Sequence, residues 1–586
     1  MRVERLQVGT LLQIAEALEA VVGRCFGPTG GQVLFTRDTG EVLITRDGWK
    51  ILTSLKLDHP VARVLVSCVS THCEAAGDGA KSFLLLLAGL LRGIQAARLR
   101  GLELRRAAVA LRSFQTQVLD GVIRESLALF AAPLLPCGDP IGLLGALTRA
   151  YFRGKVARTH CGFLSEMVCE FYQRWRCVGE AEGAALISCH FAQLHTAVPG
   201  LPVGRSRVLE GLVFHRDFAV RCPMDGPLRA VAVGVALDNS LAPPGVTVSL
   251  ASQAQFQSHC RWLANQVERG MASLQKLEVK LLMSSVKQSD LVLDHAQRAG
   301  ISVVECMDED ELALFCRFGG ADLFTNPGDW SQIGEEHIAT VTFCQPAVLG
   351  PDRCAHVGFP ERRGLVPHCL VLCGPVPGLA DQCVCAFRGV VRMLQRAFEP
   401  IQSHHRHSGE AKERATCNEL KRPNQQADEQ LGSIASNIRN KAGSLLPVGG
   451  AFEFLLHHHL LQHATHTSCP DTQAACKLVA GAVLSVPRRL YPGRRFLEAR
   501  SSFLRTFPPR PAVEGAHGFE SMACKYQLLV SVLQCLGSLL SVDIILHTSM
   551  SSQRARRREQ GEEEEGEEQA EEEGGQEERE EEGGVG

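Results

Sequence analysis

Residues 27–82 contain three glycine-centred turns, and the rest of the chain is best interpreted from them. The turns are Gly27-Pro28-Thr29-Gly30-Gly31, Thr45-Arg46-Asp47-Gly48 and Gly77-Asp78-Gly79-Ala80-Lys81-Ser82. Between the first two turns, apolar residues on both sides of an Asp-Thr-Gly step predict a β-hairpin over 32–45. After the third turn, the apolar run 83–91 predicts a helix that is buried on all sides within a large domain.

These turns have the features of a polyanion site. Glycines let backbone N–H groups approach a phosphate closely, and a turn that opens a helix adds the unpaired N–H groups of the helix N-terminus. Asp78 would repel a bare phosphate, but it is well placed to hold Mg²⁺ between itself and the phosphates. Taken singly, each motif also fits an ordinary tight turn or an aspartate N-cap. Their order and spacing together favour a binding site.

Length and composition indicate a globular protein of about three to four domains. The chain has 586 residues, of which 45% are hydrophobic and 21% are charged. Its 23 cysteines are scattered, which predicts reduced thiols of a cytosolic protein. The N-terminus has the charges of an amphipathic segment and not of a signal peptide, and the apolar run 84–91 is too short to cross a bilayer. We therefore predict no membrane span.

Charge is distributed unevenly along the chain. Residues 559–586 contain 15 glutamates and one arginine, so this segment has a charge of −14. The net charge of the chain is −3, so the rest of the chain has a charge of +11. A mildly basic body without an aromatic RNA-binding motif predicts no nucleic-acid partner. The Arg/Glu-rich tail, 551–586, is predicted to be disordered.

The order of the motifs resembles the nucleotide-binding half of group II chaperonins. The shared features are Gly-Pro-x-Gly, the hairpin, Thr-x-Asp-Gly, the His59-Pro60 step and Gly-Asp-Gly. Near the other end, residues 446–453 are similar to the family's Pro-Gly-Gly-Gly-Ala-x-Glu turn. The residues of these motifs are most similar to those of the divergent chaperonin-like Bardet–Biedl syndrome proteins.

This resemblance implies a multidomain α+β fold. A mostly helical equatorial domain would comprise 1–146 and 434–550, an intermediate domain 147–206 and 367–403, and an α/β apical domain 207–366, with a polar insertion at 404–433. The sequence supports the apical assignment, because strand and helix patterns alternate between 228 and 304 and Gly300 suits a helix C-cap.

The resemblance also implies ATP and Mg²⁺ as ligands. The residues that match the family's binding motifs are Gly27, Pro28, Gly30, Asp47, Gly48, Gly77, Asp78, Gly79, Ser82, Gly449 and Gly450, with Asp78 as the metal ligand. No catalytic residue is assigned, because the family's water-orienting Asp aligns with Gly389, which has no side chain to orient water.

Further departures affect the phosphate turns. The family's Gly-Asp-Gly-Thr-Thr-Thr loses two hydroxyl groups here, and Ser82 retains one. Lys81 has a charge to offer to a phosphate, but we interpret it as a solvated lysine at a helix start. Arg46 replaces the family's Asn, and Val448 replaces a glycine. We therefore predict ATP binding with degraded hydrolysis.

The function implied by the resemblance is assistance in assembling the BBSome, a ciliary coat complex, and so in ciliogenesis. The implied partners are related Bardet–Biedl chaperonin-like proteins, cytosolic chaperonin subunits, and BBSome subunits as clients. The implied location is the cytoplasm, with association to the basal body, centrosome and cilium. Two alternatives stay open: an active, ATP-hydrolysing ring chaperonin that folds proteins, and a non-chaperone interaction scaffold.

Overall fold

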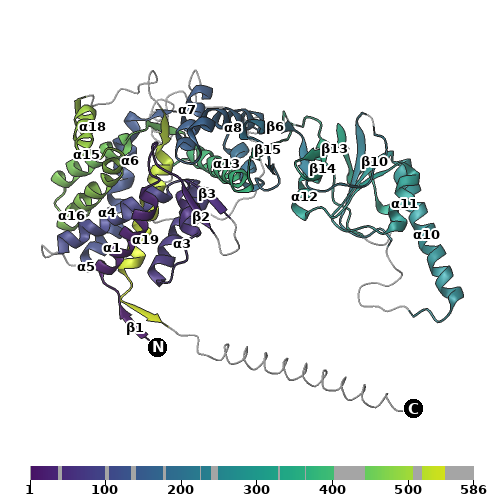
Figure 1. Ribbon diagram of the computed structural model, residues 1–586, viewed down its shortest axis with the longest axis horizontal. Coiled ribbons are helices and arrows are strands. Elements are labelled where there is room, and N and C mark those ends of the chain that lie inside the picture. Colours follow the sequence, from purple (N-terminus) through teal and green to yellow (C-terminus); the bar gives the residue numbers. More distant parts are fainter. Residues whose placement is uncertain are drawn as a thin grey trace, which may run out of the picture.

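The computed structural model describes residues 2–36, 42–98, 104–133, 140–175, 180–224, 226–238, 249–326, 330–362, 364–401, 443–505 and 518–547. The predicted insertion and the predicted disordered tail lie outside these residues. Three bodies follow one another along the longest axis of the molecule (Figure 1). A helical body contains both ends of the described chain, a middle body surrounds α13 (Pro377–Phe398), and a sheet-containing body ends in α10 (Gln253–Lys276).

The helical body combines the two ends of the chain, and its elements lie within the two segments predicted for an equatorial domain. Its N-terminal helices are α1 (Val8–Gly23), α2 (Gly48–Thr53), α3 (Pro60–Ala76), α4 (Ala80–Arg98), α5 (Leu104–Phe114) and α6 (Asp120–Glu125). Its C-terminal helices are α15 (Ala451–His466), α16 (Pro470–Val483), α17 (Ser485–Leu490), α18 (Arg494–Arg505) and α19 (Met522–Leu540). The predicted hairpin is β2 (Val33–Thr36) with β3 (Val42–Thr45).

The core of this body forms around α4, which packs against α1, α16 and α19. Its leucine run is buried as the sequence predicted. Among the described residues, α4 and α19 are long and apolar enough to cross a membrane, but 56% and 61% of their most apolar windows are buried inside the protein. Core packing accounts for their composition.

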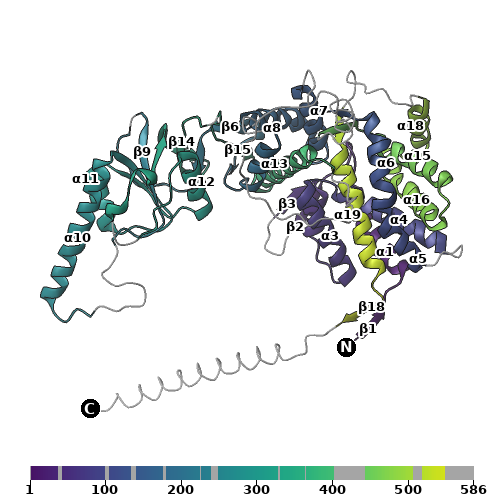
Figure 2. The same cartoon turned by 180° about the vertical axis from the view of Figure 1, so that it is seen from behind.

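Two small sheets join distant parts of the helical body. The first strand, β1 (Arg2–Arg5), pairs antiparallel with the last, β18 (Ile544–His547), so the two ends of the described chain lie side by side (Figure 2). The strand β16 (Ser444–Pro447) lies between β4 (Ala132–Pro133) and β17 (Phe519–Ser521).

The middle body contains α7 (Pro140–Arg153), α8 (Cys161–Trp175), α9 (Glu180–Cys189) and α13. Its sheet places β15 (His368–Gly374) between β5 (His195–Pro199) and β6 (Arg207–Glu210). The helix α13 packs against α9 and β15 on one side and contacts α3 and β3 of the helical body on the other. It therefore connects the two bodies.

The third body has the predicted α/β pattern. Its sheet has the order β12 (Ile338–Val341), β9 (Leu228–Val233), β10 (Val279–Ser284), β11 (Ser302–Val304) and β8 (Phe218–Val220). Buried residues of α10 and α11 (Asp290–Ala299) pack on one face of this sheet. Buried residues of α12 (Glu309–Gly319) pack on the other face, together with the sheet formed by β13 (Phe343–Leu349), β14 (Asp352–Gly358) and β7 (Leu212–Phe214). Gly300 caps α11 with φ 68°, as predicted.

Candidate functional site

The first three predicted turns meet where α1 ends and where α2 and α4 begin. Their candidate residues are Gly27, Pro28 and Gly30 after α1, Asp47 and Gly48 at the start of α2, Gly77, Asp78 and Gly79 between α3 and α4, and Ser82 in the first turn of α4. Gly77 has φ 72° and Gly79 has φ 106°. Because side chains rarely adopt this left-handed conformation, the local geometry explains both glycines.

The fourth predicted turn, Gly449 and Gly450, precedes α15 and lies close to the first. The Tyr491 hydroxyl, just after α17, donates to the Gly449 carbonyl at 3.2 Å. The neighbouring Leu490 lies against Gly27, where an added Cβ would be 3.2 Å from the leucine Cδ2. The end of α17 therefore contacts both turns.

Lys81 connects the turns, and the prediction that it is solvated was wrong. Its side chain is buried, and Nζ donates to the carbonyls of Cys25 at 2.9 Å, Arg46 at 3.1 Å and Gly154 at 3.1 Å. Burial, followed by the nearby charge of Lys155, lowers the pKa of Lys81 to about 8. The ammonium group thus links two turns of the helical body to the segment that follows α7.

Arg46 makes a second set of links of the same kind. One guanidinium nitrogen donates to the Gly30 carbonyl in the first turn, and another donates to the Val156 carbonyl at 3.2 Å. Arg46 is also buried. Arg46, which stands where the family has Asn, therefore donates its hydrogen bonds to carbonyl groups of the protein's own backbone.

Lys155 lies between the two aspartates of the turns, and the sequence analysis did not identify it. Its Nζ is 2.6 Å from Asp47 Oδ1 and 3.0 Å from Asp78 Oδ1. Burial alone would lower the pKa of Lys155, but Asp47 and Asp78 hold it well above its ordinary value. Burial likewise opposes ionisation of Asp78, and Lys155 outweighs it and lowers the pKa of that carboxyl. The three groups form a charged cluster.

Gly389, in α13, packs against the turn that contains Gly77. The Tyr151 hydroxyl donates to the Gly77 carbonyl at 3.2 Å. A Cβ added at Gly389 would lie 2.1 Å from this hydroxyl and 2.8 Å from the Gly77 carbonyl oxygen. No side chain at position 389 fits this arrangement. Tyr151 therefore occupies the space into which a side chain at position 389 would project.

Comparison with known proteins identifies the family of this chain. Residues 18–492 match the model of the TCP-1/cpn60 chaperonin family. The chain belongs to this chaperonin family. Its relatives include the human "BBSome complex assembly protein BBS10", 31% identical over 95% of this chain and 98% of the relative, and the Pongo abelii protein of the same name, 30% identical over the same shares. A thermosome subunit of a Desulfurococcus species is 20% identical over 57% of this chain and 60% of its own length.

These relatives confirm the sequence-based assignment to chaperonin-like Bardet–Biedl proteins and the multidomain α+β fold. Three of these relatives carry the name of the tenth protein of that group, which the quoted motifs resemble. In a chaperonin, the cluster around Asp78 is where a nucleotide and Mg²⁺ are expected, so its present partners decide whether such a ligand fits.

The carboxylates that would hold Mg²⁺ already have a cationic partner. Mg²⁺ binds oxygen ligands in a near-octahedral shell and retains waters, whereas Oδ1 of both Asp47 and Asp78 contacts an ammonium group here. Asp78 keeps 46% of its side chain exposed and Asp47 keeps 12%, so only Asp78 has a free face. As arranged, the two aspartates do not fit a bound Mg²⁺ unless Lys155 moves.

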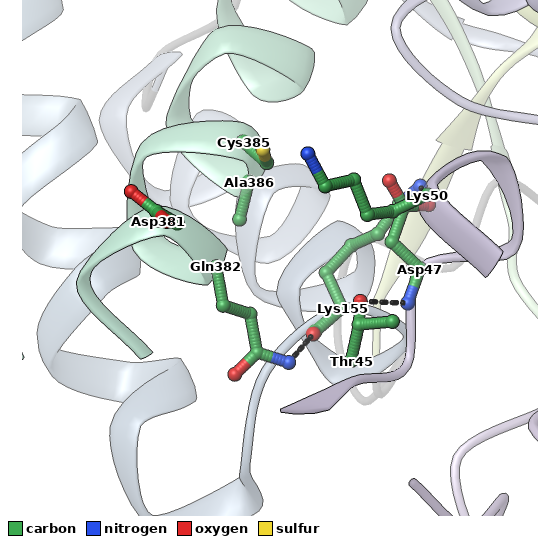
Figure 3. A pocket seen from close by; sticks show the side chains of 8 residues that line it. All are labelled: Thr45, Asp47, Lys50, Lys155, Asp381, Gln382, Cys385 and Ala386. Carbon is green, nitrogen blue, oxygen red and sulfur yellow. Dashed lines mark hydrogen bonds and ion pairs between the residues drawn. The ribbon is translucent and has the colours of Figure 1, made fainter. Parts of the chain in front are cut away.

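The adjoining cavity is too small for a phosphate. Thr45, Asp47, Lys50 and Lys155 line one side, and Asp381, Gln382, Cys385 and Ala386 of α13 line the other (Figure 3). Its volume of about 10 Å³ is close to the minimum for one water molecule. The amide of Gln382 donates to the Lys155 carbonyl at 3.1 Å and helps to close the cavity (Figure 3).

Asp381 is the carboxylate of α13 that lines this cavity, and sequence reasoning did not consider it. It precedes Gly389 by two helical turns, roughly 12 Å along the axis. Asp381 therefore does not take the place of the missing carboxylate. Among the described residues, no group of three or more His, Cys, Asp or Glu side chains is arranged to hold a metal ion.

His72 is a buried titratable group behind the Gly79 turn, and we predict that it makes the protein acid-sensitive. Its Nδ1 contacts the Ser531 hydroxyl at 3.1 Å, whereas Nε2 is buried without a hydrogen-bond partner. Burial lowers the pKa of His72 from 6.5 to about 4. Between these two values the unfolded chain binds the proton and the folded chain does not, so stability falls as the pH decreases.

The His72→Gln variant should therefore lose less stability than the wild type between pH 6.5 and 4, by at most about 3 kcal/mol. Urea unfolding at pH 7, 5.5 and 4 measures the difference. The exposed His466→Gln serves as the matched control. Parallel profiles for wild type and His72→Gln would show that His72 is not the source of acid sensitivity.

Proposed function

We propose that this chain is a chaperonin-like assembly factor for the BBSome, acting without ATP hydrolysis of its own. The observation that carries the proposal is its similarity to proteins named for BBSome assembly over 95% of this chain and 98% of the human relative. This match covers all three bodies, whereas the match to the thermosome subunit covers 57% of this chain.

The geometry of the site supports the part of this proposal that excludes ATP hydrolysis by this chain. Phosphoryl transfer to water requires a group that orients the water. Gly389 lacks a side chain, and the Tyr151 hydroxyl fills the adjoining space. An assembly factor can offer binding surfaces without turnover. Binding of ATP and Mg²⁺ at the turns, which the sequence predicts, would require Lys155 to leave Asp47 and Asp78.

The proposed partners are the related Bardet–Biedl chaperonin-like proteins, subunits of the cytosolic chaperonin, and BBSome subunits as clients. We propose that these encounters take place in the cytoplasm and near the basal body, centrosome and cilium. In this scheme the partners would contribute ATP-driven motion, and this chain would contribute binding surfaces.

The test is to delete the gene in ciliated cells and restore the tagged full-length protein. Mass spectrometry of the purified complex identifies the partners, and native sizing of BBSome subunits measures assembly. The proposal expects chaperonin-related partners and recovery of full-size BBSome by the wild type. A large self-assembled ring with steady ATP turnover would favour the active chaperonin instead. Unchanged BBSome size after deletion would contradict the proposal.

A further inference from the structure

Residues of the glycine turns 45–48 and 77–82 contact each of the three residues of the segment Gly154-Lys155-Val156. Lys81 donates to the Gly154 carbonyl at 3.1 Å, and Arg46 donates to the Val156 carbonyl at 3.2 Å. Between them, the Lys155 ammonium contacts both aspartates. We call this set of contacts the cation clamp. It joins the end of α7, in the middle body, to two turns of the helical body, 45–48 and 77–82.

Two of the three cations are departures of this chain from the family pattern. At the position of Lys81 the family motif has Thr, and at the position of Arg46 it has Asn. The hydroxyl of a threonine is one bond from Cβ, so it cannot span the distance that the four-carbon lysine stem spans to Gly154. The contacts to Gly154 and Val156 therefore depend on the residues that replaced the motif.

The cations of the clamp have partners within the protein itself. The Lys155 ammonium lies between two carboxylates, and Lys81 donates to three carbonyl oxygens. The two terminal nitrogens of Arg46 each donate to one carbonyl, whereas its buried Nε has no hydrogen-bond partner. In a nucleotide site, Mg²⁺ and phosphates would supply the charges that such turns require. Here the polypeptide itself supplies the cations, and their partners are two of its own aspartates and several neutral backbone carbonyl oxygens.

Close packing reinforces the same connection. An added Cβ at Gly77 would lie 2.0 Å from the Gly389 carbonyl oxygen and 2.8 Å from the Met393 nitrogen, both in α13. The Tyr151 hydroxyl, from α7, donates to the Gly77 carbonyl. The phosphate turn is thus in direct contact with both helices of the middle body that border the site.

We propose that the cation clamp replaces nucleotide and Mg²⁺ as the element that holds the middle body against the helical body, so that this closure needs no nucleotide. Closure is then a permanent property of the chain, and not a step in an ATP cycle. The inference concerns the conformation of this chain alone and does not depend on whether BBSome subunits are its clients.

The test uses hydrogen exchange of the full-length protein, read at the amides of residues 154–156, with and without Mg·ATP. In the wild type we expect slow exchange that Mg·ATP leaves unchanged. The double variant Lys81→Thr/Arg46→Asn restores the family's residue types, and its exchange without nucleotide should be about tenfold faster, because opening the clamp becomes easier.

The matched control makes the same two residue changes at exposed positions of the helical body, as Lys477→Thr/Arg63→Asn. Its exchange should equal that of the wild type. Slower exchange of the wild type on adding Mg·ATP would overturn the proposal, and this arm needs no variant to fold. Equal exchange in the clamp variant and the control would overturn it as well.

Discussion

The Gly389→Asp variant should be less stable than the wild type by about 3 kcal/mol, and it should not hydrolyse ATP. At first sight the change restores the carboxylate that chaperonins use to orient water. In this structure, however, the new Cβ would lie 2.1 Å from the Tyr151 hydroxyl and 2.8 Å from the Gly77 carbonyl oxygen. Both neighbours belong to packed elements, so the backbone of α13 must move. Urea unfolding and an ATP turnover assay measure the two effects.

The control for this prediction is a double-mutant cycle between positions 389 and 151. Tyr151→Phe removes the hydroxyl, which is the nearest atom to the new Cβ, whereas the ring carbon that carries it is 3.3 Å away. Gly389→Ala should therefore cost less stability in the Tyr151→Phe background than in the wild type. Equal costs in both backgrounds would mean that Tyr151 does not block the position. ATP turnover by Gly389→Asp at wild-type stability would contradict the whole account.

The sequence predicted the fold well wherever a local pattern is sufficient. Glycine turns, the hairpin and the alternation of strand and helix from 228 to 304 depend on neighbours in the chain, and the elements formed near the expected bounds. The mostly apolar run that begins at Leu228 continues to Leu237, but β9 ends at Val233. There the chain leaves the sheet and the Gly234 amide donates to the Phe324 carbonyl, a contact that no local pattern reveals.

The candidate site was predicted less completely, because its cations depend on contacts between distant residues. Lys81 has the sequence environment of an exposed lysine at a helix start, and only the approach of Gly154 buries it. Lys155 follows a helix end without a motif, and its partner Asp47 is 108 residues away. Local sequence therefore identified the glycines and Asp78, but not the groups that surround them.

The second large effect is expected for Lys155→Met, which should destabilise the protein by about 3 kcal/mol. The methionine keeps most of the side-chain volume but removes the ammonium from between Asp47 and Asp78. Asp47 carries most of the expected cost, since its side chain is only 12% exposed, whereas that of Asp78 is 46% exposed and can be solvated. Urea unfolding at pH 7 measures the loss.

A rescue variant separates this electrostatic cost from a packing defect. Lys155→Met combined with Asp47→Asn removes the unpaired buried charge together with its partner, so it should recover much of the lost stability. Lys155→Met with Asp78→Asn should recover less, because water already reaches Asp78. If both rescues failed equally, the loss would come from packing around the methionine. If instead millimolar Mg²⁺ stabilised Lys155→Met but not the wild type, the ammonium would be shown to occupy a latent metal site, as the cation clamp requires.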